Sequence, residues 1–211
     1  GTHLVESLLN NNFKVICLVR NPLKNSNLLK KGAVLIKGSI EDFSDEIFND
    51  YKIDVLFHLA WHLVNKVNSV EHLETHYKGQ KYFLNKVLNS SIKKIIIAGS
   101  CFEYGMQNGL MSTKNKTIPI TKYGIAKNKL RKLIEKKSSI YPNKTFFWTR
   151  IFYVYGEGQN SKSLYPSLVK AIKNKDKSFN LSRGFQIRDF IHVKDVTKKL
   201  ISFLDIDNKG F

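Results

Sequence analysis

The stretch KKIIIAGS, residues 93–100, decides the fold class. Three consecutive isoleucines followed by Ala98 and Gly99 form a short apolar run, which is typical of a strand buried on both faces of a parallel sheet. Ser100 ends this run. Open parallel sheets bind their ligands at the carboxyl ends of the strands, so we expect Ser100 to face a ligand crevice.

Similar apolar runs alternate with longer amphipathic segments on both sides of this strand. We predict further strands over residues 13–20, 33–38, 54–61 and 144–152. We predict helices over residues 2–12, 41–51, 69–89, 122–139, 163–175 and 193–204. This alternation favours βαβ units and a doubly wound parallel sheet of the α/β class. Because the periodicity weakens from Tyr153 onward, we predict one domain over residues 1–152 and part of a smaller lobe over residues 153–211.

The composition is strongly basic. The 211 residues include 35 Lys and Arg against 17 Asp and Glu, which gives a formal net charge of +18. A polyanionic partner such as nucleic acid is one interpretation of this charge. We favour another, because segments such as RKLIEKK and KAIKNKDK keep their apolar residues at helical spacing and their lysines are therefore expected on solvated helix faces.

Other features disfavour several classes of protein. The apolar runs fall short of the roughly 18 residues that a membrane-spanning helix needs. Cys17 and Cys101 lack CxxC spacing, so we expect neither a disulfide scaffold nor a zinc site, and we expect a cytoplasmic location. His58 and His62 are four residues apart, but His58 falls in a predicted strand and no carboxylate completes the set. No metal is expected.

The helix predicted over residues 122–139 carries YGIAK, residues 123–127, at its beginning. Tyr123 and Lys127 are four residues apart, which puts them on one helix face with about 6 Å between their Cβ atoms. An ammonium group near a phenol favours the phenolate and lowers the pKa of the tyrosine toward that of a working acid or base. With Ser100 to hold a substrate oxygen nearby, the three residues predict a site of proton transfer.

Five motifs together extend this prediction to a family. In chain order they are DVLFHLAW (54–61), AGSCFEYG (98–105), YGIAK (123–127), RIFYVYGEGQ (150–159) and QIRDFIHVKDV (186–196). In this order they resemble the extended short-chain dehydrogenase/reductases, which include nucleotide-sugar epimerases, dehydratases and reductases. The resemblance covers essentially the whole chain and implies a Rossmann-type fold. It also implies that the first strand and the C-terminal part of the small lobe lie outside residues 1–211.

The resemblance assigns roles to individual residues. Tyr123 would be the catalytic acid or base, Lys127 would tune it and bind the nicotinamide ribose, and Ser100 would hydrogen-bond the sugar oxygen at the reacting carbon. Arg188 would bind the nucleotide sugar, because a guanidinium suits phosphate oxygens, although an ion pair with Asp189 or Asp195 is the alternative. The remaining cofactor contacts implied are Gly1, as the last glycine of the dinucleotide fingerprint, Arg20, Ser39, Ile40, Leu59, Ala60 and Trp61.

The residues at the end of the strand over 13–20 bear on the type of cofactor. NAD-binding members of the family carry an acidic residue there for the ribose 2′-hydroxyl, whereas an arginine favours the 2′-phosphate of NADP. This chain has Val19 and Arg20, with no acid. We therefore favour NADP(H) over NAD(H), with stacking of Arg20 on the adenine of NAD as the alternative.

Three departures from the family pattern narrow the activity. The 4,6-dehydratases place Asp-Glu directly after the serine or threonine, and this chain has Cys101 and Phe102 there, which argues against a dehydratase. His76 stands where an asparagine usually precedes the turn into the long helix. Tyr153 stands at a second common asparagine position, so a substrate contact of the family is in doubt.

Residues 99–109 and 150–166 are most similar to the branch that reduces 4-keto-6-deoxy nucleotide sugars, as in 6-deoxytalose- or abequose-type precursors of surface polysaccharide. The expected reaction is hydride delivery from NAD(P)H to the C4 carbonyl, with Tyr123 as proton donor. A 4-epimerase of the same family is one alternative. A non-catalytic RNA-binding or regulatory module on the same fold is another. The resemblance further implies a homodimer that uses the helix over residues 122–139.

Overall fold

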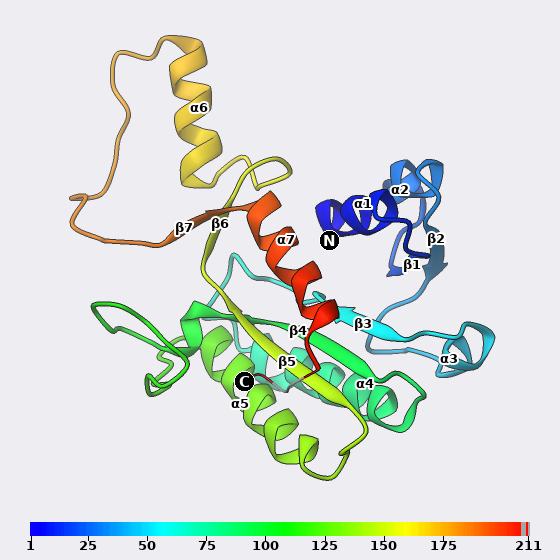
Figure 1. The fold of residues 1–211 in the computed structure, drawn as a ribbon. Helices are drawn as coiled ribbons and strands as arrows, with labels where there is room; N and C mark the ends of the chain where they lie inside the picture. Colours follow the sequence, from blue (N-terminus) through cyan, green and yellow to red (C-terminus); the bar gives the residue numbers. More distant parts are fainter. Residues whose placement is uncertain (208–209, 211) are drawn as a thin grey trace.

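We describe the protein from a computed structural model, which describes residues 1–207 and residue 210. Its strands form three parallel groups (Figure 1). The strands are β1 (Ile16–Val19) paired with β2 (Val34–Lys37), β3 (Val55–His58), β4 (Lys94–Ser100) and β5 (Thr145–Ile151) in that order, and β6 (Tyr153–Tyr155) paired with β7 (Phe190–His192). The predicted α/β class with parallel strands is confirmed.

Helices connect these strands. They are α1 (Thr2–Asn10), α2 (Ser26–Lys30), α3 (Glu46–Asp50), α4 (Tyr77–Asn89), α5 (Lys122–Ser138), α6 (Leu164–Asn174) and α7 (Val193–Ser202). A π-helical turn, His72–His76, leads directly into α4. Within the described part of the chain, no helix combines the length and the apolar character needed to cross a membrane.

The helix predicted over residues 41–51 is much shorter in the structure. The Asp42 carboxylate accepts hydrogen bonds from the backbone N–H of Ser39 at 3.1 Å and from its hydroxyl at 2.5 Å, which makes a local turn. Aspartate side chains compete for backbone donors in this way and favour turns over helix interiors. Helix α3 therefore begins only at Glu46.

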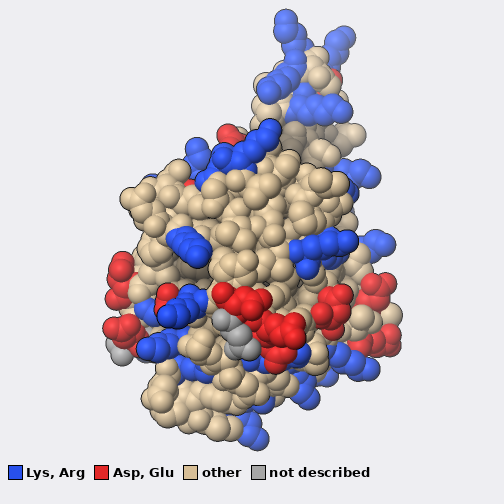
Figure 2. All heavy atoms as spheres, turned by 90° about the vertical axis from the view of Figure 1, so that its right-hand side faces the viewer, with Lys and Arg blue, Asp and Glu red and all other residues tan. Residues whose placement is uncertain are grey.

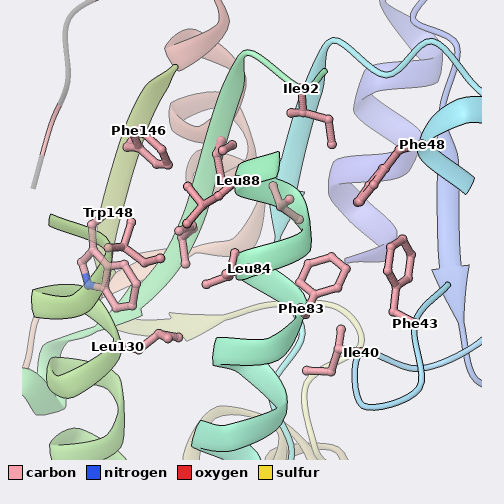
Figure 3. Close-up of a cluster of buried hydrophobic side chains, with 14 residues drawn as sticks. Ile40, Phe43, Phe48, Phe83, Leu84, Leu88, Ile92, Leu130, Phe146 and Trp148 are labelled. Carbon is pink, nitrogen blue, oxygen red and sulfur yellow. The ribbon is translucent and has the colours of Figure 1, made fainter. Parts of the chain in front are cut away.

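The residues of β4 alternate between two hydrophobic clusters. Ile95 and Ile97 face a cluster built by α4, α5 and β5, whereas Ile96 faces a second cluster formed with α1 and α7 (Figure 1). Figure 3 shows the first cluster, in which Phe83 and Leu84 of α4 lie against the strands. Full burial of a side chain of this size contributes about 1.5–3 kcal/mol, so β4 is held from both faces.

The strands differ in the number of neighbours with which they pair. β4 is hydrogen-bonded to β3 on one side and to β5 on the other. β1 and β3 each pair with a single strand among the described residues, and they belong to separate groups. The carboxyl ends of β3 and β4, at His58 and Ser100, lie at the same edge because the strands are parallel.

Helix α6 and the segment 175–189 project from the body of the molecule (Figure 1). On the face drawn in Figure 2, basic side chains cover the projection, while acidic and basic side chains are mixed over the body. Most residues from 175 to 190 are exposed. The proposed division at residues 152 and 153 coincides with the change from β5 to β6 and stays a prediction.

Candidate active site

The three residues predicted for proton transfer come together at the carboxyl end of β4. Ser100 is the last residue of the strand, and Tyr123 and Lys127 lie in the first turns of α5. All three are buried, with exposed fractions of 6% for Ser100, 9% for Tyr123 and 3% for Lys127. The Ser100 hydroxyl lies within hydrogen-bonding reach of the Tyr123 hydroxyl.

Local sequence explains why α5 begins at this place. The Thr121 hydroxyl accepts a hydrogen bond from the Gly124 N–H at 3.1 Å and so caps the helix. A Cβ atom on Gly124 would lie 2.4 Å from the carbonyl oxygen of Phe102, so only glycine allows this close approach. The Tyr123 N–H donates to the carbonyl of Val67 at 2.8 Å. These contacts bring the tyrosine next to the end of β4.

Burial dominates the electrostatics of Tyr123. It raises the pKa of the phenol to about 12, because the phenolate loses its contact with water, while the hydrogen bond with Ser100 acts in the opposite direction. The sequence predicted a lowered pKa from the nearby Lys127. The structure reverses that direction, since Glu103 and Cys101 add to the effect of burial. A phenol of this kind keeps its proton at neutral pH and gives it up only to a stronger base, such as an alkoxide.

Lys127 is held between a carbonyl and an aromatic ring. Its ammonium donates to the carbonyl oxygen of Ala98 at 2.7 Å and lies 4.1 Å from the centre of the Trp61 ring. Burial lowers the pKa of Lys127 to about 7, although the charge of Glu103 opposes this shift. The side chain therefore changes between its charged and neutral forms near neutral pH.

Sequence reasoning did not identify Glu103, whose carboxylate holds the backbone of Ser100. Glu103 is fully buried and accepts a hydrogen bond from the Ser100 N–H at 2.8 Å and from the Trp148 indole at 2.9 Å. The guanidinium groups of Arg150 and Arg131 lie 3.3 Å and 3.7 Å from its carboxylate. Ser100 and Glu103 form a capping box, and the pattern S-x-x-E in SCFE was the signal that could have identified it.

Four histidines lie near the candidate site, and sequence reasoning considered only the pair of His58 and His62 among them. They are His58, His62, His72 and His76, of which all but His62 are buried. Burial lowers the pKa of His58 to about 4, against a hydrogen bond with Gln80 that raises it. Over residues 1–207 and 210, no three His, Cys, Asp or Glu side chains are placed to hold a metal ion.

Three of the residues predicted to contact the cofactor, Leu59, Ala60 and Ile40, contact other residues of the protein. The Leu59 side chain packs against the second hydrophobic cluster, and the carbonyl of Ala60 accepts from the Gln80 amide at 2.8 Å. Ile40 is 6% exposed and belongs to the first cluster, so its side chain points into the core.

The other predicted contacts lie at the surface or at a chain turn. Arg20 follows β1 and is exposed, and the Ser39 hydroxyl is engaged by Asp42. Gly1 caps α1, and a Cβ there would meet none of the described atoms within 4 Å. The last glycine of a dinucleotide fingerprint allows close packing of helix on strand, and the described residues show no such close approach at Gly1.

Arg188 approaches the site from the projecting segment. Its guanidinium lies 4.3 Å from the centre of the Tyr153 ring and donates to the Gln186 amide oxygen at 2.5 Å. Its charge also lowers the pKa of Cys101, although burial outweighs it and the pKa of that thiol is raised overall. Among the described residues Arg188 makes no ion pair with Asp189 or Asp195, which was the alternative prediction.

The residues present fit a nicotinamide dinucleotide. An ammonium group has three N–H donors, and the hydrogen bonds of the described residues use one of those of Lys127, on Ala98. A buried ammonium with donors to spare suits the hydroxyl groups of a ribose. The half-buried face of Trp61 lies directly beside it.

The comparisons with known proteins agree with this arrangement. A family described as NAD dependent epimerase/dehydratase family matches residues 1–210. The dTDP-6-deoxy-L-talose 4-dehydrogenase (NAD(+)) of Aggregatibacter actinomycetemcomitans is 30% identical over 95% of this chain and 74% of that protein. A putative UDP-glucose 4-epimerase of Methanocaldococcus jannaschii is also 30% identical, over 99% of this chain and 71% of that protein.

A solved structure shows the same fold. UDP-N-acetylglucosamine 4-epimerase from Methanobrevibacter ruminantium, in complex with UDP-N-acetylmuramic acid, superposes with a TM-score of 0.86 at 25% identity. The match covers 100% of this chain and 71% of that one.

Proposed function

This chain belongs to the NAD-dependent epimerase/dehydratase family, and from that premise we propose that it reduces the C4 carbonyl of a 4-keto-6-deoxy nucleotide sugar. The observation that carries the proposal is the joint burial of Ser100, Tyr123 and Lys127 at the end of β4. The similarity to a protein named as a 6-deoxytalose 4-dehydrogenase supports chemistry between an alcohol and a ketone at C4.

The proposed proton donor is Tyr123. Its raised pKa of about 12 keeps the hydroxyl protonated at neutral pH. As the carbonyl is reduced, its oxygen gains negative charge, and the proton of Tyr123 passes to that oxygen. Ser100 holds the same oxygen through its hydroxyl. When it is bound, the nicotinamide supplies the hydride.

Lys127 has a binding role in this proposal. Its free N–H donors hold the ribose of the dinucleotide, and its contact with the Trp61 ring fixes the direction of the side chain. Arg188 contributes to binding of the nucleotide part of the substrate. Loss of one charge-assisted hydrogen bond weakens binding by about 1.5–3 kcal/mol, so Arg188→Ala is expected to raise KM by about 10- to 100-fold.

Cofactor choice is assigned to Arg20. Its exposed guanidinium after β1 supports a preference for NADP(H), because an arginine there suits a 2′-phosphate. The related talose 4-dehydrogenase carries NAD(+) in its name. Rates with NADPH and NADH, compared between the wild type and Arg20→Ala, test the assignment. A selective loss with NADPH supports it, and an equal change with both cofactors contradicts it.

The decisive experiment follows nicotinamide absorbance with a panel of 4-keto-6-deoxy nucleotide sugars. The wild type is expected to consume reduced cofactor in proportion to the sugar, and Tyr123→Phe to lose about 10²- to 10⁴-fold in rate, the usual contribution of a general acid. Tyr82→Phe removes the same hydroxyl from an exposed tyrosine on α4 and is the matched control. An undiminished rate in Tyr123→Phe would contradict the proposal.

The second candidate is a 4-epimerase. It is favoured by the similarity to the putative UDP-glucose 4-epimerase, which is equally identical to this chain. An epimerase oxidises and reduces its sugar within one turnover, so the sugars would interconvert without net loss of reduced cofactor. Product sugars resolved by NMR distinguish the two reactions.

We further propose that residues 153–211 contribute to the substrate-binding lobe.

We also propose that the chain forms a homodimer through α5. The exposed side of α5 carries Lys129, Lys132 and Lys136, which would repel a second copy. Because salt screens such charges, dimerisation is expected to strengthen at high ionic strength. Light scattering at low and high salt tests this.

A further inference from the structure

A group of aromatic and imidazole rings packs against Tyr123. Trp61 follows β3, and His72 and His76 lie at the two ends of the π-helical turn before α4. The ring of His72 lies 5.3 Å from that of Tyr123 and 5.3 Å from that of His76, measured between ring centres. Both imidazoles are buried. π-helical turns are rare and occur frequently at functional sites.

The hydrogen bonds define where the imidazole protons lie. The Trp61 indole N–H donates to Nδ1 of His72 at 3.1 Å, so Nδ1 carries no hydrogen. Nε2 of His72 therefore carries it and donates to the carbonyl of Lys66 at 3.1 Å. Nδ1 of His76 lies 3.3 Å from the same nitrogen, whose single lone pair the indole already uses. This network requires a neutral His72.

Trp61 is the residue that connects this network to the active site. Its ring lies 4.1 Å from the Lys127 ammonium and meets the Tyr123 ring edge-on, with centres 5.8 Å apart. An indole has a single N–H, and His72 accepts it. The orientation of Trp61 against both residues therefore depends on Nδ1 of His72.

We propose that His72 positions Trp61 against Tyr123 and Lys127 only while it is neutral, so that mild acid releases Trp61 and disables the site while the fold persists. The inference rests on the proposed function, because it concerns the same tyrosine and lysine. A proton on Nδ1 would turn the acceptor into a donor that faces the indole N–H. The hydrogen bond to Trp61 is then lost.

The surroundings of His72 favour the neutral form. Burial lowers its pKa, and the charge of Lys127 from α5 lowers it further, while Glu71 and the carbonyl groups of Lys66 and Leu63 oppose the shift. Tyr123, which is uncharged at neutral pH, also faces it. Because the pKa of folded His72 lies below its ordinary value of 6.5, the midpoint of its protonation lies below that pH.

The surroundings of His76 act in the same direction. Burial lowers its pKa, followed by the neighbouring imidazoles of His72 and His62, and Glu71 and Glu41 oppose the shift. Adding a proton to one imidazole therefore discourages a second. His76→Gln would remove the second titrating imidazole beside His72 and is expected to move protonation of His72 to higher pH.

The fluorescence of Trp61 reports this switch without turnover, because a protonated imidazole in contact with an indole changes its emission. The signal of Trp148 is removed by subtracting the titration of Trp61→Phe. The wild type is expected to show a transition centred below pH 6.5, with the circular dichroism of the fold unchanged. The transition should disappear in His72→Gln, whose amide oxygen can still accept from the indole, and move to higher pH in His76→Gln.

His3→Gln, which changes a histidine on α1 bonded to the Glu157 carbonyl, should titrate like the wild type. Absence of a transition in the wild type, or an unchanged one in His72→Gln, would overturn the inference.

Activity gives the second readout. With saturating substrate and each profile scaled to its own maximum, the wild-type rate is expected to fall about tenfold per pH unit below the fluorescence midpoint, as titration of one group requires. His72→Gln should lack this acid limb. A fluorescence switch without reductase activity would support the positioning role and contradict the proposed function. Reductase activity with the same acid limb in both proteins would do the opposite.

Discussion

The two sides of the candidate active site are built from different chemistry. On one side the carboxylate of Glu103 is enclosed by two guanidinium groups and holds the backbone of Ser100. On the other side the imidazole of His72 holds Trp61 through a single hydrogen bond. Guanidinium groups keep their charge at all physiological pH values, whereas imidazoles do not. One side of the site is therefore anchored by permanent charges, whereas the charge of the other side depends on the pH.

The largest expected effect is the loss of unfolding free energy when Glu103 is substituted. Glu103→Gln leaves the guanidinium of Arg150 without a carboxylate and leaves Arg131 only with the half-exposed Glu135, although both guanidinium groups are at most 10% exposed. Removing one partner of a buried ion pair costs about 3–5 kcal/mol of unfolding free energy, measurable by denaturant titration. Glu135→Gln is the matched control, because Glu135 pairs with the same Arg131 but is 50% exposed and its loss costs about 0–1 kcal/mol. Equal losses in the two variants would contradict the prediction.

The next effect sharpens the contrast in pH response. Folded His58 stays neutral down to about pH 4, whereas in the unfolded chain it takes up a proton near pH 6.5. The unfolded state therefore gains a proton that the folded state lacks, and the free energy of unfolding falls as the pH drops from 6.5 to about 4. The difference corresponds to about 3 kcal/mol.

A variant separates this contribution from those of the carboxylates. His58→Gln removes the titrating group, so its unfolding free energy should fall less steeply than that of the wild type over the same range. Parallel curves for the two proteins would show that His58 does not contribute.

The smallest effect concerns the contact at which α5 meets the segment of Glu103. Gly124→Ala places a methyl group 2.4 Å from the Phe102 carbonyl, and overpacking of this kind costs about 1–3 kcal/mol. Gly79→Ala on α4 meets only the flexible Glu41 side chain, at 3.1 Å, and should be neutral or gain up to about 1 kcal/mol from helix propensity. Denaturation midpoints compare the two. A greater loss in Gly79→Ala would contradict the close packing at Gly124.

Sequence patterns predicted much of the fold and part of the site. The apolar runs located β4 and its serine, and the spacing of Tyr123 and Lys127 put them on one helix face, as the structure has them. The prediction of a lowered pKa for Tyr123 had the wrong direction, because burial depends on residues distant in the sequence.

The supporting residues were harder to predict for a related reason. Glu103 gains its importance from Arg131 and Arg150, which lie on other elements. The contact of His72 with Trp61 depends on a π-helical turn, which the hydrophobic periodicity of the sequence does not indicate. Both are properties of packing between segments.

The unequal pairing of the strands sets how fast backbone hydrogens exchange with heavy water. β4 is bonded on both sides, so its amides should exchange only when the sheet opens as a whole. β1 and β3 have paired neighbours on a single side among residues 1–207 and 210, so part of their amides should exchange through small local openings. The strand that carries Ser100 would then keep its hydrogens longest, and the slowest exchange in the chain would lie directly beneath the reacting groups.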